Sequence, residues 1–157
     1  MKVKNPRIIK AVKELELPIG EYAVFGSGLL EVLGIRKGND IDLIVTKELF
    51  ENMGEKWEKY IYENNGDEAM KYKGEGFDVA FYYCHRCKMD EAEVKNFIKR
   101  ATIIDGVAFV NLEDTMTWKR RWGREKDLKD TELIKEYLGG KMASQQYANL
   151  KLCQSRR

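Results

Sequence analysis

Two aspartates set one residue apart give this chain its clearest chemical potential. Asp40 and Asp42 occur in the stretch NDIDLIV, an apolar run typical of a strand. Alternate residues of a strand point to the same face, so we expect both carboxylates to project together, opposite Ile41 and Leu43. Two carboxylates so placed repel each other, and a divalent cation such as Mg²⁺ removes that penalty. Otherwise both acids are solvated at a strand end, or Asp40 caps a turn.

A third acid, Asp78, lies in the stretch GFDVAFYY, which also has the composition of a strand. If this strand and the strand of Asp40 and Asp42 are neighbours, three carboxylates converge. Such a site suits two metal ions about 4 Å apart that clamp the attacking and leaving oxygens of a phosphoryl transfer. The alternative is that Asp78 is a turn acid that follows Gly76.

A glycine-serine-glycine turn precedes the first two acids. Gly26, Ser27 and Gly28 lie between an apolar run and a short helical segment. Backbone N–H groups at the start of a helix attract anions such as phosphate, the serine hydroxyl can donate to a phosphate oxygen, and glycine permits close backbone approach. No Gly-Lys-Ser/Thr follows, so this is not a Walker loop. An ordinary turn with Ser27 as the helix cap remains the alternative.

A basic segment lies nearer the C-terminus. Residues 118–130 include six basic and three acidic residues, which makes the segment a candidate for contact with an anion. Lys119 and then Lys126 are the residues of this segment that we expect to meet such an anion. The alternative is a solvated helix face with local ion pairs such as Arg121–Glu125, where Asp127 caps the next helix and Asp130 interacts with its dipole.

The order of these features resembles the DNA polymerase β-type nucleotidyltransferase superfamily. The stretch FGSGLLEVLGIRKGNDIDLIV is particularly similar to the branch that contains lincosamide-type antibiotic nucleotidyltransferases and nucleotidyltransferase-like toxin–antitoxin proteins. Members of that branch often carry a helical Lys, then an Arg-x-Lys-Asp-x-x-Asp segment that opens the next helix. The stretch LEDTMTWKRRWGREKDLKDTELI has both, at Lys119, Arg124, Lys126, Asp127 and Asp130. The resemblance covers about residues 22–138.

The resemblance implies a role for each motif residue. Asp40, Asp42 and Asp78 would bind Mg²⁺, with two ions expected, and Asp78 would also orient or deprotonate an acceptor hydroxyl. Gly26 and Ser27 would hold the β- and γ-phosphates of a nucleoside triphosphate. The remaining nucleotide contacts would come from Gly28, Lys119 and Lys126.

The activity so implied is transfer of a nucleoside monophosphate, AMP foremost, to a hydroxyl group, with release of pyrophosphate. The acceptor could be a small molecule, a protein side chain or an RNA end, because no separate acceptor-binding domain is evident. Two other functions stay open. One is a non-catalytic, antitoxin-like module that binds a protein partner, and the other is a nucleic-acid binder that uses residues 118–130.

Composition indicates a folded protein without a membrane span. The chain has 157 residues, of which 43% are hydrophobic and 34% charged, and its net charge of +2 is too small to imply nucleic-acid binding by itself. No apolar run has the length of a membrane span, and the N-terminus lacks the core of a signal peptide. We therefore expect a cytoplasmic protein. In the stretch CHRC (Cys84, His85, Cys87) a nearby fourth zinc ligand is lacking, so we expect free thiols in a loop.

The elements that must position these residues follow from local patterns. We expect an α/β (α+β) fold in which helices flank a mixed, partly antiparallel sheet. Residues 1–140 would form one domain, and the polar residues 141–157 a tail that is a frayed helix, an arm for a partner or a non-native extension. The expected helices span residues 7–15, 27–33, 47–53, 90–100, 112–122 and 127–138, and the expected strands 22–25, 40–46, 57–63, 68–74, 77–83 and 107–112.

Overall fold

The computed structural model describes residues 2–53, 57–61, 63, 68–72, 77–79 and 88–155. Within these residues, six helices and seven strands follow one another along the chain. They are α1 (Arg7–Lys13), β1 (Tyr22–Phe25), α2 (Gly28–Val32), β2 (Ile41–Val45), α3 (Lys47–Asn52), β3 (Trp57–Ile61), β4 (Glu68–Tyr72), β5 (Phe77–Val79), α4 (Glu91–Lys99), β6 (Thr102–Ile104), β7 (Val107–Phe109), α5 (Leu112–Trp122) and α6 (Glu125–Ser155). The predicted strand residues 80–83, and Cys84, His85 and Cys87, lie outside the described part of the chain.

The strands form one mixed sheet in the order β3-β4-β5-β2-β1-β7-β6. The central pair β1 and β2 is antiparallel, β5 joins β2 in parallel, and β7 joins β1 in parallel. The outer pairs β3–β4 and β6–β7 are antiparallel. The predicted fold class, helices flanking a mixed and partly antiparallel sheet, is therefore confirmed.

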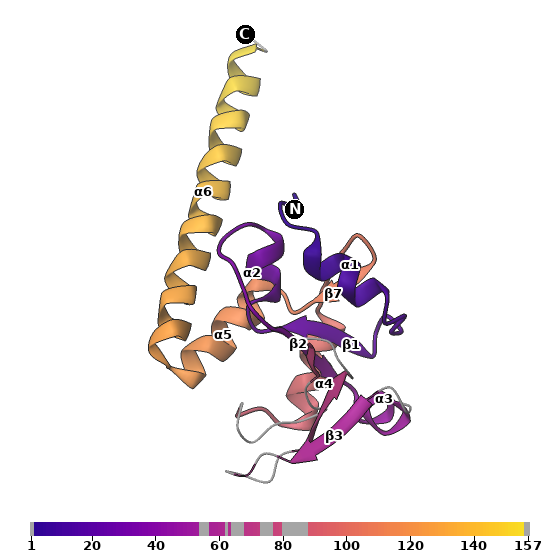
Figure 1. Ribbon diagram of the computed structural model, residues 1–157. Helices are drawn as coiled ribbons and strands as arrows, with labels where there is room; N and C mark the ends of the chain where they lie inside the picture. The colour runs from indigo at the N-terminus through magenta and orange to yellow at the C-terminus, as the bar shows by residue number, and fades with distance from the viewer. Residues whose placement is uncertain are drawn as a thin grey trace.

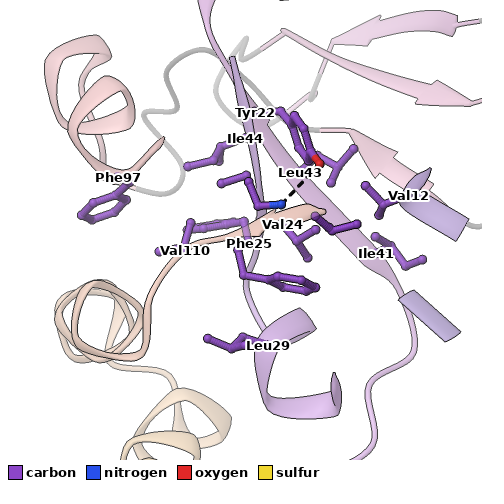
Figure 2. Packing of buried hydrophobic residues seen from close by; sticks show 14 of the residues in the cluster. Val12, Tyr22, Val24, Phe25, Leu29, Ile41, Leu43, Ile44, Phe97 and Val110 are labelled. Carbon is purple, nitrogen blue, oxygen red and sulfur yellow. Dashed lines mark hydrogen bonds between the residues drawn. The ribbon is translucent and has the colours of Figure 1, made fainter. Parts of the chain in front are cut away.

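The core lies on both faces of the central strands. All four residues of β1 are buried, which is the pattern of a strand covered on both sides. Figure 2 shows Phe97 of α4 and Val12 of α1 on opposite sides of β1 and β2. Since the central strands are covered on both faces, the groups that they offer to solvent lie mainly at the strand ends and in the adjoining loops.

One strand, β6, was absent from the sequence prediction. It forms a hairpin with β7 through Asp105 and Gly106, whose φ angles are 48° and 82°. Positive φ at both central residues belongs to the tight turn that Asp-Gly favours between two strands. The dipeptide, flanked by apolar residues, was the signal that could have revealed β6.

The last helix is longer than the sequence suggested. We expected it to end at Gly139-Gly140, and this is wrong: α6 continues to Ser155 and projects beyond the rest of the domain (Figure 1). Each glycine weakens a helix by only about 1 kcal/mol, and neither residue has the positive φ that would end one. Residues 141–155 are therefore helical. Although α6 has 31 residues, no helix in the described ranges has the apolar length that crossing a membrane requires.

Candidate functional site

A cleft of about 440 Å³ brings several of the predicted site residues together. One wall is formed by the α2 N-terminus, the α2–β2 loop and the start of β2, and the other by the first three turns of α6. Residues from the first wall are Ser27, Arg36, Asn39, Asp40 and Asp42, and those from α6 are Lys126, Lys129, Asp130 and Leu133. The cleft thus joins carboxylates and cations from segments far apart in the sequence.

The first two acids, Asp40 and Asp42, both line this cleft. Asp42 is half-buried within β2, opposite Phe25 of β1, while Asp40 is exposed immediately before the strand begins. Gly26 borders them: its φ is 71°, and a Cβ atom at this position would lie 3.0 Å from Asp42 Oδ2. A side chain at residue 26 would therefore be strained and would displace the carboxylate, so this position favours glycine.

The third acid lies next to Asp42 in the sheet. Strand β5 pairs in parallel with β2, and the register places Asp78 directly beside Asp42. The condition on which the three-carboxylate hypothesis depended, that the two strands are neighbours, is therefore met by the backbone. The side chain of Asp78 lies outside the described structure, so its function as a ligand or base stays a prediction.

The glycine-serine-glycine turn contacts both the cleft, through Ser27, and the core, through Gly28. Ser27 occupies the N-cap position of α2 but makes no side-chain capping bond, and it lines the cleft. Gly28 is also needed for packing, because a Cβ atom there would lie 2.2 Å from Val24 Cγ1, and its contact with a nucleotide stays a prediction. Its lack of a side chain lets α2 pack on β1. Since α2 has only five residues, its dipole is small, and the Ser27 hydroxyl stays the predicted donor to an anion at this turn.

A buried glutamate that the sequence analysis missed supports the α2–β2 loop. Glu31 is only 3% exposed. Its carboxylate accepts hydrogen bonds from Arg7 at 2.7 and 2.8 Å and from the Gly38 backbone N–H at 3.0 Å. The hydrogen bonds from Arg7 lower the pKa of Glu31 and outweigh burial, which acts in the opposite direction. An acid inside the apolar stretch GLLEVL was the available signal.

The basic segment forms a buried ion-pair network between α5 and α6. Lys119, with a side chain 4% exposed, lies 2.8 Å from Asp130 Oδ2 and 3.4 Å from Asp127 Oδ1. Arg124 donates to Asp127 at 2.6 Å, and Arg36 donates to both carboxylate oxygens of Asp130, with Nη2 at 2.7 Å. Burial raises the pKa of Asp130, but the hydrogen bonds from Arg36 and Lys119 more than compensate and lower it overall.

These contacts revise the expectations for residues 118–130. Lys119 is enclosed by carboxylates and is not among the described residues that line the cleft, whereas the exposed Lys126 is. Asp127 is wholly buried in the first turn of α6, which begins at Glu125, so the interpretation of Asp127 as the N-cap is wrong. The suggested Arg121–Glu125 pair is also wrong, because Arg121 pairs with Glu93 at 2.6 Å.

The oxygen groups of the cleft suit a hard divalent cation. Mg²⁺ typically takes one or two protein carboxylates together with water and substrate phosphates, and Asp40 and Asp42 supply that set. Among the described side chains there is no cluster of three or more metal-ligating residues, and the Asp78 side chain is not one of those described. The donor set therefore fits Mg²⁺ with two carboxylates, and the third is expected from residue 78.

Comparison of the chain with models of known protein families, with curated proteins and with solved structures gives no match. Its class rests on what the fold and site define: an α+β domain in which an acidic strand end shares a cleft with two exposed lysines, Lys126 and Lys129, of a long helix. The nucleotidyltransferase resemblance accordingly stays a prediction.

Proposed function

We propose that this protein is a divalent-cation-dependent nucleotidyltransferase. The observation that carries the proposal is that Ser27, Asp40 and Asp42 line one cleft with Arg36 and Lys126. Carboxylates on one wall suit a hard cation, and a hydroxyl with cations around it suits a polyphosphate. A site that offers both is matched to a metal-bound nucleoside triphosphate better than to either ligand alone.

The chemistry proposed is an in-line transfer. The oxygen of an acceptor hydroxyl bonds to the α-phosphorus of a nucleoside triphosphate, AMP being the group foremost expected to be transferred. The bond from that phosphorus to the oxygen bridging to the β-phosphate breaks, and pyrophosphate leaves with the electron pair. The hydroxyl proton passes to a carboxylate, and Asp78 is the residue expected to take it. Bound divalent cations would supply neutralisation of the phosphate charge.

The chain's own groups have distinct parts in this scheme. Ser27 would donate to a phosphate oxygen, and Lys126 would attract the pyrophosphate portion from the α6 side. Asp40 and Asp42 would hold the metal-bound phosphates at the strand end. Arg36 lines the same cleft but is already committed to Asp130, so its contribution is indirect.

The proposal is tested by changing one acid without changing its shape. Asp42→Asn should reduce Mg²⁺-dependent binding of ATP, measured by calorimetry, at least tenfold, because ligating carboxylates provide most of the attraction for the metal. It should abolish pyrophosphate release when labelled nucleoside triphosphates are incubated with candidate small-molecule, protein and RNA acceptors. The matched control is Asp105→Asn, an exposed acid in the β6–β7 turn, where asparagine tolerates the positive φ. Wild-type binding and turnover in the Asp42 variant would refute the proposal.

One feature favours a protein-binding function as the second candidate. The C-terminal half of α6 projects beyond the domain, and Met142 on it is 66% exposed (Figure 1). An exposed helical arm is a common means of contact with a partner helix. If the arm acts as an antitoxin-like module, a protein recovered with the wild type would also be recovered with Asp42→Asn.

A further inference from the structure

We propose that Arg36 is a positioning residue that fixes the Asp40-bearing loop against α6. This inference rests on the proposed function, since it concerns the same cleft. It assigns to Arg36 neither contact with substrate nor a part in the chemistry. Its role is to hold one wall of the cleft, the loop of residues 34–40, at a set distance from the other.

The guanidinium of Arg36 uses all three nitrogens to join the loop to the helix. Nε and Nη2 donate to the two carboxylate oxygens of Asp130, and Nη1 donates to the Lys37 carbonyl at 2.7 Å. The same side chain thus bonds both to the backbone of its own loop and to α6. A planar fork bonded to a carboxylate at two points fixes orientation as well as distance.

The partner of Arg36 is itself immobilised. Asp130 is 3% exposed as a side chain and lies 2.8 Å from the Lys119 ammonium of α5. At the other end of the loop, Gly38 donates its N–H to the buried Glu31 carboxylate, two residues before Asp40. The loop is therefore tied at residue 36 to α6 and at residue 38 to α2, and Asp40 follows directly.

The buried carboxylates of the network do not depend on Arg36 for neutralisation. Three cations (Lys119, Arg124 and Arg36) face two buried carboxylates (Asp127 and Asp130). With Arg36 removed, each carboxylate still has a cation, because Asp127 keeps Arg124 and Asp130 keeps Lys119. Since no buried charge is stranded, Arg36→Gln should fold, and its effect on the cleft can be measured in the full-length chain.

A purely electrostatic role and a positioning role of Arg36 predict opposite changes in divalent-cation affinity for Arg36→Gln. Removing a positive charge beside Asp40 and Asp42 should strengthen binding of a divalent cation if charge alone matters. If Arg36 holds the loop, its loss should weaken binding, because outer-shell supports of ligating groups typically contribute 10- to 100-fold in metal affinity. Lys126→Gln is the matched control: it also removes a cation from the cleft, but Lys126 is an exposed residue of α6 and not part of the loop.

The experiment combines two measurements on the wild type, Arg36→Gln, Arg36→Lys and Lys126→Gln. Titration with Mn²⁺ followed by electron paramagnetic resonance should show affinity about tenfold weaker for Arg36→Gln and unchanged or tighter for Lys126→Gln. Hydrogen exchange at Gly34, Ile35 and Gly38, whose N–H groups are bonded in the structure, should be faster in Arg36→Gln only. Arg36→Lys, which has one ammonium in place of the fork, should lie between.

The outcomes keep the two proposals apart. Unchanged exchange in residues 34–38 of Arg36→Gln, or Mn²⁺ affinity as high as that of Lys126→Gln, would overturn the positioning role. If the wild type binds neither Mn²⁺ nor ATP, the proposed function fails. In that case the exchange measurement alone decides whether Arg36 holds the loop, faster exchange supporting the role and unchanged exchange overturning it.

Discussion

Replacement of Lys119 by methionine tests how the network between α5 and α6 contributes to stability. Methionine keeps the length of the side chain and has a similar helix propensity, so the change mainly removes the ammonium group. In the structure that ammonium lies 2.8 Å from Asp130 and 3.4 Å from Asp127, and all three side chains are at most 4% exposed. The variant therefore leaves two buried carboxylates with one cation fewer between them.

The expected loss is set by what the two carboxylates retain. Removing one partner of a buried ion pair typically costs about 3–5 kcal/mol. Asp127 keeps Arg124 and Asp130 keeps Arg36, whose side chains are 35% and 33% exposed, so the lower figure applies. With a urea dependence of about 2 kcal/mol/M, a loss of about 3 kcal/mol moves the unfolding midpoint down by about 1.5 M.

Urea unfolding followed by circular dichroism measures this, with Lys129→Met as the control. Lys129 pairs with Glu125 at 3.0 Å, but the two side chains are 71% and 86% exposed. Such a pair contributes only about 0.3–0.5 kcal/mol. If Lys119→Met unfolds within about 1 kcal/mol of the wild type while losing ATP affinity, the structural role is refuted and Lys119 is a nucleotide ligand, as the sequence suggested.

The other predictions concern pH and the glycines of the last two helices. Folding lowers the pKa of Glu31 from 4.5, so the ionised carboxylate stabilises the protein fully above pH 4.5, and this stabilisation is lost as the pH falls through the lower pKa of the folded state. Glu31→Gln should therefore lower the free energy of unfolding by about 1.5–3 kcal/mol at pH 7 and by progressively less in acid. Urea unfolding at each pH measures this difference. A cost equal at pH 7 and pH 2 would contradict this. Gly123→Ala should destabilise the protein by about 1 kcal/mol, because residue 123 ends α5 with a φ angle of 71°. Gly139→Ala should stabilise α6 by about the same amount, because the added Cβ has no atom within 4 Å and alanine favours a helix. Equal effects of the two alanines on the thermal midpoint would refute the assignment.

Elements with strong local signals were predicted closely. Helix α5 begins after Asn111, whose side chain caps Asp114 N–H, and it ends at the left-handed Gly123. Both signals act within one turn of the residue that carries them, so they can be read without knowledge of the rest of the fold. Strand β1 likewise has the predicted bounds, because an apolar run that ends in glycine leaves little choice.

Elements whose signals compete with their surroundings were predicted less well. The Gly139-Gly140 pair lowers helix propensity without forbidding a helix, and α6 continues through it. Gly28 was predicted to allow the close approach of a ligand, and the structure adds a packing requirement, because a Cβ atom at residue 28 would collide with Val24. The sequence does not show this requirement, which arises only when α2 packs on β1.

The sequence by itself determined which residues could make an acidic strand end beside a glycine-serine turn, since period-two alternation and turn chemistry are local properties. The tertiary structure decided which charges meet. Arg36 and Asp130 are 94 residues apart, and nothing near either one indicates the other. Lys119 was drawn into the interior because α6 packs against α5, where a buried carboxylate needs a cation. Choice of partner depends on which surfaces are desolvated together, and that is settled only when the whole chain has folded.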